Sequence, residues 1–335
     1  MGDVGSGRAW FGGSMASEYD SGWVGAGESD DLDRSLIAEV ENEPFDLATA
    51  HVMTVLGPVI PAALEVTLAS GSLLGADEPP DALVDGVSLA AAELELLHAA
   101  GGRAVWISAI SGDAEAMDRA WDVATRSPCH VVLAARVRGL RAEVASQATD
   151  QLVTELTAQV TIGSGRRRVR AGILGVEVSA EPDGLASAVL LDTIVETHRL
   201  TGVPMLLRGR ARPVNDWLDQ LMDAGIRPDR VVVALRHDED PDADQRLLDA
   251  GATVLIEREV GRGITDRDLA MAIARRVTDG FGDQLLLGDR LGHGWNELLE
   301  RLPLALMENG LDAPLVRRLF VENPARALTM VKDER

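Results

Sequence analysis

The sequence predicts an α/β protein whose eight parallel strands alternate with helices and close into a (β/α)8 barrel, or TIM barrel. Short aliphatic runs recur from Val52 onward, and stretches with helical periodicity separate them. Eight such units within about 280 residues suit a closed barrel better than an open doubly wound sheet. The chain has 335 residues and is 46% hydrophobic, so it can bury a substantial core. Only 3% of its residues are aromatic, and we expect that core to be mainly aliphatic.

Each predicted strand is a continuous apolar run rather than an alternating one. Such runs indicate a parallel sheet whose strands are buried on both faces, by the barrel interior and by the surrounding helices. A small opening strand at residues 54–58 precedes the barrel. The barrel strands are predicted at residues 64–68, 104–108, 130–135, 171–176, 204–207, 231–235, 252–256 and 284–288.

The stretches between the strands have the pattern of amphipathic helices. In one of them, Leu191, Ile194 and Val195 are three and four residues apart, which places them on one side of a helix. Glu196 and Arg199 fall on the other side and are expected to face water. This pattern predicts helices that cover the outside of the barrel.

The first 48 residues differ from the rest of the chain. They are rich in glycine and serine and carry eleven acidic residues against two arginines, Arg8 and Arg34. Such a segment buries too little apolar surface to offset its chain entropy, so we predict a flexible acidic arm. The predicted organisation is therefore an arm at residues 1–48, a barrel at 49–331 and a tail at 332–335. The aromatic residues near the start of the arm are either a docking motif for a partner or scattered side chains: Trp10, Phe11, Tyr19 and Trp23.

Charge and cysteine content exclude several partners and compartments. The formal net charge of −22 disfavours non-specific binding to nucleic acid and to anionic membranes. The single cysteine, Cys129, lies in an apolar run and is expected to be a buried, inert thiol. One cysteine cannot form an intrachain disulfide, which fits a reducing compartment. No signal-peptide pattern and no apolar run of about 20 residues is present, so we expect a cytoplasmic protein.

Two common phosphate-binding motifs are missing from the sequence. No G-x-G-x-x-G fingerprint follows the first strand, and a Walker loop needs a Gly-Lys pair, whereas the only lysine is Lys332. A glycine-rich piece at residues 162–165 leads into Arg166, Arg167 and Arg168 and is predicted to be a surface loop.

Several short segments follow one another along the chain: Thr54-Val55-Leu56-Gly57-Pro58, Val66-Thr67-Leu68, Ala100-Gly101-Gly102, Ala171-Gly172-Ile173-Leu174, Thr201-Gly202-Val203-Pro204, Asp229-Arg230-Val231-Val232, Gly292-His293-Gly294-Trp295, Asn309-Gly310-Leu311 and Val321-Glu322-Asn323-Pro324-Ala325. Taken in this order, they resemble the phosphotriesterase family of the amidohydrolase superfamily. The resemblance spans about residues 52–330 and is closest near the C-terminus.

The resemblance implies hydrolytic chemistry at a pair of metals. In that family, a carboxylated lysine or a glutamate bridges two divalent ions, and four histidines and one aspartate complete the ligands. The ions activate a bridging water and polarise the substrate's phosphoryl or carbonyl oxygen. On this chain the family's His-x-His falls on Ser70 and Ser72, whose hydroxyls are poor zinc ligands. The bridging position falls on Gly175, or on Val176 in members that use glutamate.

The remaining ligand positions also depart from the family pattern. The histidine that ends the fifth strand falls on Arg208, a fixed cation, and the one that ends the sixth falls on Leu235. Only the aspartate of the eighth strand is kept, as Asp289, and the local spacing there is one residue short. We therefore expect no metal and no other cofactor. The six histidines do not rebuild an H-x-H or H-E-x-x-H pair: His51, His98, His130, His198, His237 and His293.

Polar residues at the carboxyl ends of the predicted strands mark the expected site, because barrel enzymes place their chemistry there. These residues are Ser70, Ser72, Ser108, Glu177, Arg208, Arg210, His237, Glu257, Arg258 and Asp289. The catalytic candidates among them are Asp289 and Glu177. The ligand-binding candidates are Arg208, Arg210, Ser70, Ser72 and, in the loop after the eighth strand, His293.

Two interpretations of these side chains remain open. Glu177 lies two residues after Gly175 and so shares its strand face, which points it into the barrel mouth. In the first interpretation, Arg208 neutralises Glu177 or Asp289 and an ion pair replaces the metal cluster. In the second, Arg208 and Arg210 bind a phosphate or carboxylate, and Asp289 or Glu177 acts as general base.

Two functions from different classes follow from these interpretations. The first is a non-hydrolytic member of the family that acts as a structural, regulatory or assembly partner. Members of the family are commonly homodimers, so the resemblance implies a self-pair or a pair with an active paralogue. The second is a metal-independent enzyme that acts on a small ester, lactone, or phosphorylated or carboxylated molecule.

Overall fold

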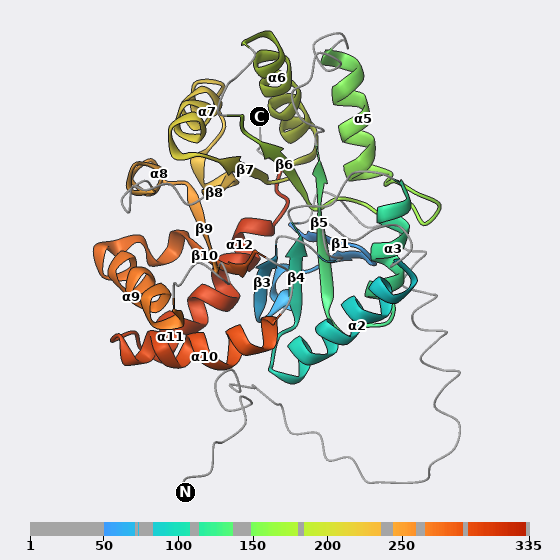
Figure 1. Cartoon of the computed structure of the whole chain (residues 1–335). Helices are drawn as coiled ribbons and strands as arrows, with labels where there is room; N and C mark the ends of the chain where they lie inside the picture. The colour runs from blue at the N-terminus through green and yellow to red at the C-terminus, as the bar shows by residue number, and fades with distance from the viewer. Residues whose placement is uncertain are drawn as a thin grey trace, which may run out of the picture.

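Eight parallel strands close into a barrel in the order β10-β3-β4-β5-β6-β7-β8-β9, and helices surround them (Figure 1). This arrangement confirms the predicted (β/α)8 class. The computed structural model describes residues 50–70, 73, 83–107, 114–136, 149–179, 184–235, 244–258, 265–290 and 294–332. The predicted acidic arm, residues 1–48, lies outside the described residues.

The barrel strands lie within a few residues of their predicted positions. The first shows the largest shift and begins three residues later than the predicted residue 64, because Pro61–Leu64 forms a 3-10 helix (η2) that starts with a proline. The strands are β3 (Thr67–Ser70), β4 (Ala104–Ile107), β5 (His130–Arg136), β6 (Ile173–Glu177), β7 (Met205–Gly209), β8 (Val231–Leu235), β9 (Thr253–Arg258) and β10 (Leu285–Asp289).

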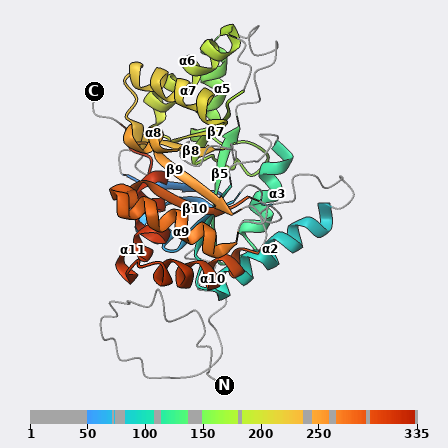
Figure 2. The ribbon, with the colours of Figure 1, turned by 60° about the vertical axis from the view of Figure 1, so that its left-hand side comes forward.

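Helices follow the strands and cover the outside of the barrel, as both views show (Figure 2). In α6, Ile194 and Val195 are buried while Glu196 and Arg199 are exposed, which confirms the predicted amphipathic pattern. The helices are α2 (Leu83–Ala99), α3 (Ala114–Ala124), α5 (Thr149–Thr161), α6 (Gly184–Thr201), α7 (Ala211–Asp223), α8 (Gln245–Asp249), α9 (Asp266–Arg276), α10 (Trp295–Glu308), α11 (Ala313–Arg317) and α12 (Asn323–Leu328).

The opening segment is a hairpin rather than the single strand predicted at residues 54–58. β1 (Val52–Thr54) pairs antiparallel with β2 (Gly57–Val59). Thr54 Oγ1 donates a hydrogen bond to the Gly57 carbonyl at 2.6 Å, and Gly57 has φ 131°, a value that favours glycine. The Val55 amide donates to the Val131 carbonyl at 2.8 Å and attaches the hairpin to the start of β5.

Apolar side chains form two separate layers, which fixes the direction of each strand residue. The inner cluster includes Leu206 of β7, Leu255 of β9 and Leu286 of β10 and fills the barrel. Leu285 and Leu287 of β10 belong instead to the larger outer cluster between the strands and the helices. Successive strand residues therefore alternate between barrel interior and helix layer, as the two-residue period requires.

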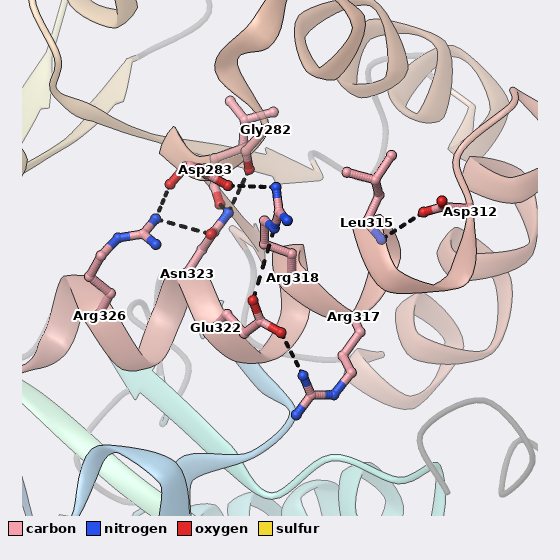
Figure 3. Close-up of polar contacts among 10 residues, drawn as sticks. Gly282, Asp283, Asp312, Leu315, Arg317, Arg318, Glu322, Asn323 and Arg326 are labelled. Carbon is pink, nitrogen blue, oxygen red and sulfur yellow. Dashed lines mark hydrogen bonds and ion pairs between the residues drawn. The ribbon is translucent and has the colours of Figure 1, made fainter. Parts of the chain in front are cut away.

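The C-terminal segment anchors the start of β10. Asn323 is fully buried, and its Nδ2 donates to the carbonyls of Gly282 and Leu285, at 2.8 Å each. Arg326 donates to the Asp283 carbonyl and, at 3.0 Å, to Asn323 Oδ1 (Figure 3). This explains physically why an asparagine follows Glu322 in a segment that resembles the family: its amide satisfies two buried carbonyls.

A buried arginine joins two chain segments that are far apart in sequence. Arg230 is 7% exposed and donates to the carbonyls of Gly202 and Thr329, at 2.9 and 2.7 Å. Gly202 has φ 71°, and a Cβ atom there would lie 2.4 Å from the Val331 carbonyl oxygen. The family-like segments at residues 201–204 and 229–232 thus meet the C-terminal chain, and only glycine fits at position 202.

Burial of the cysteine follows the sequence prediction. Cys129 is 3% exposed and its Sγ donates to the Leu94 carbonyl at 3.4 Å. Its surroundings raise the pKa of the thiol to about 11, because burial disfavours the thiolate. Among the helices that the structure describes, none combines the length and apolarity needed to cross a membrane.

Candidate functional site

The carboxyl ends of the strands bring the predicted charged residues to one end of the barrel. Glu177 at the end of β6 is the direct Cα partner of Arg208 in β7. Asp289 at the end of β10 is the partner of Arg258 in β9 on one side and of Ser70 in β3 on the other. The register therefore places Glu177 beside Arg208, and Asp289 beside Arg258 and Ser70, although these residues are far apart along the chain.

Arg208 and Glu257 form a two-pronged ion pair across β8. The Arg208 Nη1 donates to Glu257 Oε2 at 2.6 Å, and Nη2 donates to Oε1 at 2.9 Å. Their side chains are 10% and 8% exposed. The positions of Leu206 and Leu255, two residues earlier on the same strands, place both side chains on the inner face of the barrel. The pair thus lies in the barrel mouth.

Nearby carboxylates stabilise the positive charge of Arg208. Burial by itself would lower the pKa of its guanidinium, but the charge and hydrogen bonds of Glu257, together with the charge of Glu177, hold it above its ordinary value. The arginine at this position is therefore a permanent cation between two acids. In the first of the two interpretations of the sequence, Arg208 neutralises Glu177 or Asp289. In the structure its bidentate partner is Glu257, and Glu177 acts on it electrostatically.

Asp289 forms its own ion pair with a different arginine. The Arg258 Nε donates to Asp289 Oδ2 at 2.8 Å, and the two side chains are 11% and 0% exposed. Asp289 lies two residues after Leu287 and four after Leu285, both members of the outer cluster, so it shares their strand face, on the helix side of the barrel.

The second ion pair continues into the helix layer. Arg258 Nη2 donates to the carbonyl of Gly294 at 2.9 Å, and the Gly294 amide donates to Glu93 Oε2 at 3.3 Å. Gly294 precedes α10 with φ 71°, and a Cβ atom there would lie 3.2 Å from the Arg258 guanidinium. Asp289 and Arg258 therefore position the start of α10 beside α2.

The described positions that the resemblance aligns with metal ligands do not offer a donor set for two ions. Gly175 has no side chain, and Val176 and Leu235 are apolar and belong to, or pack against, the outer cluster. Arg208 is a cation, which would repel a divalent metal. Within the described ranges, no group of three or more histidine, cysteine or acidic side chains is placed to hold a metal ion. Among the described residues at these aligned positions, only Asp289 is an acid or a histidine.

The other predicted site residues lie outside the two ion pairs or outside the described residues. Ser72, Ser108, His237 and His293 lie outside the described residues. Ser70 is placed by its backbone at the end of β3. The ligand-binding candidate Arg210 is exposed and immediately precedes α7.

A groove lies between the first turns of α6 and α7, close to the strand ends. It encloses about 470 Å³ and begins at Ser179, two residues after Glu177. Sequence reasoning missed it, because a groove between two helices depends on packing and leaves no local pattern in the sequence. Its lining residues are Ser179, Gly184, Ser187, Ala188, Arg212, Pro213, Asp216, Trp217 and Gln220.

The closed parallel barrel, with charged residues at the carboxyl ends of its strands, defines a (β/α)8 protein of the kind whose ligand sites lie at that end. The model of the phosphotriesterase family matches residues 50–328, and the chain belongs to this family. Among solved structures, an amidohydrolase from Mycoplasma synoviae is similar in fold, with a TM-score of 0.73 and 17% sequence identity over 85% of this chain and 93% of that chain. No curated protein matches the sequence.

Proposed function

We propose that this member of the phosphotriesterase family has lost the binuclear metal site and does not hydrolyse substrates by the family mechanism. The observation that carries the proposal is the buried pair of Arg208 and Glu257 in the barrel mouth. Removing one partner of such a pair leaves a buried charge uncompensated, so Glu257 is committed to Arg208 and not to a metal. Gly175 and Leu235, which supply no donor atom, support the same conclusion.

Metal content and activity together test this proposal. The full chain, purified without chelator, is analysed for zinc, nickel, cobalt and manganese and is assayed on a phosphotriester, a lactone and an aryl ester. We expect less than one metal ion per chain. We also expect that adding zinc or cobalt does not produce or increase hydrolysis. An intact member of the family, handled in parallel, provides the positive control. Stoichiometric metal, or hydrolysis that a chelator abolishes, would contradict the proposal.

We further propose that the protein acts as an assembly or regulatory partner, in a self-pair or a pair with an active paralogue. One helix face supports this idea. Leu89 and Leu96 of α2 are 59% and 49% exposed and seven residues apart, and exposed Ala92 lies between them. An antiparallel pair of such faces places each Leu89 against the partner's Leu96 with the small alanines at the centre, as an isologous contact requires.

Light scattering on the full chain tests the pairing. We expect a dimer mass that falls to the monomer mass in Leu89→Glu and Leu96→Glu. Leu304→Glu serves as the matched control, because Leu304 of α10 is 42% exposed and lies beside charged Arg301. If the wild-type chain is a monomer at micromolar concentration, the self-pair is refuted and only the pair with a paralogue stays a candidate. Co-purification with the paralogue then supports or refutes that pair.

A second candidate function is metal-independent binding, or turnover, of an anionic small molecule. The groove between α6 and α7 favours it: Arg212 lines the groove, and the Oγ of Ser187 is buried there with no hydrogen-bond partner among the described residues. Calorimetric titration with phosphate and with succinate tests this candidate. Binding that Arg210→Ala or Arg212→Ala weakens, and that Arg275→Ala on α9 does not, would support it. Equal affinity in all three variants would refute it.

A further inference from the structure

A turn built around three consecutive arginines protrudes at the amino-terminal end of β6. Ser164 and Val169 form a two-residue bridge with two backbone hydrogen bonds of 2.9 Å, and Arg166, Arg167 and Arg168 form the tip between them. All three arginines are exposed, and the Arg166 side chain is 93% exposed. We call residues 163–169 the arginine turn.

The arginine turn has a fixed conformation. Gly163 and Gly165 have φ of 92° and 76°, and a Cβ atom at either would lie within 2.6 Å of a backbone oxygen, that of Arg168 or of Ala114. Arg168 itself has φ 51°, a left-handed conformation that disfavours residues with a side chain. The strain indicates that surrounding contacts hold the tip in place.

Two residues of α3 supply those contacts. Asp118 accepts hydrogen bonds from the backbone amides of Arg167 and Arg166, at 2.9 and 3.2 Å, and from Arg166 Nε at 3.3 Å. These bonds lower the pKa of the Asp118 carboxyl, and the bond from the Arg167 amide has the largest effect. The Arg167 guanidinium lies 4.1 Å from the centroid of the Trp121 ring, a cation-π contact. The Asp118 carboxylate thus offsets one of the three positive charges, and the turn keeps a net positive charge.

We propose that the arginine turn binds the acidic run at residues 28–33 of the same chain. Charge complementarity carries the proposal: the run has four acids in six residues, whereas the turn is a positive feature in a chain of net charge −22. Carboxylates are the natural partners of exposed guanidinium groups, which they bind with two parallel hydrogen bonds.

The position of the first described residues supports binding within one chain. The β1–β2 hairpin, which follows the acidic segment, lies at the same end of the barrel as the turn: a Cβ atom at Gly172 would be 2.4 Å from the Met53 carbonyl oxygen. Sixteen residues separate Asp33 from Ala50, and an extended chain of that length reaches about 50 Å. Attachment to the same molecule gives the run an effective concentration of about a millimolar or more, which favours it over a second copy.

Distance measurement by pulsed electron paramagnetic resonance on the full chain tests the proposal. Nitroxide labels are placed at Ser29→Cys, within the acidic run, and at Thr161→Cys, an exposed site at the end of α5. Cys129 stays unlabelled because it is 3% exposed. We expect a narrow population of short distances that is lost in the variant Arg166→Ser/Arg167→Ser/Arg168→Ser, and also at about 1 M salt, where screening reaches about 3 Å.

A matched variant controls for the change in net charge. Arg246→Ser/Arg275→Ser/Arg301→Ser also removes three arginines, whose side chains are 65%, 68% and 64% exposed. It should keep the short distances, and unfolding curves check that both variants fold. Identical distance distributions in the two variants would overturn the proposal. Short distances that arise only when singly labelled chains are mixed would also overturn it, because they would place the contact between copies.

Discussion

The guanidinium of Arg208 and the carboxylate of Glu257 face each other through two hydrogen bonds, of 2.6 and 2.9 Å, at the inner face of the barrel mouth. The two residues come from strands that are not adjacent, with β8 between them. This pair lies in the barrel mouth, where the family's metal chemistry is expected. Substitutions in the pair therefore bear both on the stability of the barrel and on its function.

The first prediction concerns the stability of this pair. Arg208→Met or Glu257→Leu alone should lower the free energy of unfolding by about 3–5 kcal/mol, because each leaves the buried charge of the other residue without its partner. The double variant Arg208→Met/Glu257→Leu should be close to neutral, or more stable by about 1–4 kcal/mol. Urea unfolding of the four proteins completes a double-mutant cycle. Additive single effects would show that the two side chains are not coupled.

A second prediction concerns Asp289, which we assign to structure rather than to catalysis. Asp289→Ala should destabilise the barrel by about 3–5 kcal/mol, because Arg258 would then be a buried cation without its carboxylate. Since Arg258 also holds the Gly294 carbonyl, amide hydrogens in the first turn of α10 should exchange faster. Hydrogen-exchange mass spectrometry measures this. The last turn of α5, far from Asp289 in the fold, should keep its exchange rate.

A third prediction separates backbone strain from steric clash at two glycines. Gly202 and Gly225 have similar φ values, 71° and 83°, but nothing lies within 4 Å of a Cβ atom at Gly225. Gly225→Ala should therefore cost only the left-handed backbone penalty, about 1–2 kcal/mol. Gly202→Ala should cost more, since its Cβ would meet the Val331 carbonyl oxygen at 2.4 Å. Thermal unfolding of both variants measures the difference, and equal losses would contradict this reading of position 202.

A fourth prediction concerns Cys129 and alkaline pH. The pKa of the folded thiol is about 11, against 9.0 for the ordinary value, so near pH 8 the native thiolate fraction should be about 100-fold smaller than that of an exposed cysteine. Its reaction with a disulfide reagent should be slower by at least that factor than the reaction of Thr161→Cys. The unfolded chain loses its thiol proton first, so this group's contribution to stability is full below pH 9.0 and is lost as pH rises to about 11.

Urea unfolding at rising pH tests the second half of that prediction. The wild type should lose stability between pH 9.0 and about 11 more steeply than Cys129→Ala, which has no thiol to ionise. Parallel curves for the two proteins would show that the thiol is not responsible. Cys129 is only 3% exposed, so steric shielding by itself also predicts a slow reaction with the disulfide reagent. The dependence of the unfolding free energy on pH therefore tests the pKa of the thiol more directly.

The candidate site was only partly readable from the sequence. Glu177, Arg208, Glu257 and Asp289 were identified as strand-end residues because their positions after apolar runs are local features. The pairing of Arg208 with Glu257, which is 49 residues away, could not be predicted from the sequence, because any acid at a nearby strand end was an equally good partner. The groove between α6 and α7 was missed for the same reason: its walls meet only after the helices pack.

By itself, the sequence determined the barrel, the order of its strands and helices, and the side chains at the strand ends. These follow from hydrophobic periodicity, which is local and survives small errors of boundary. The tertiary structure decided which carboxylate each arginine binds and on which side of the sheet Asp289 lies. The reason is that a strand alternates its faces every residue, and buried charges take whichever opposite charge the closed barrel brings within hydrogen-bonding distance.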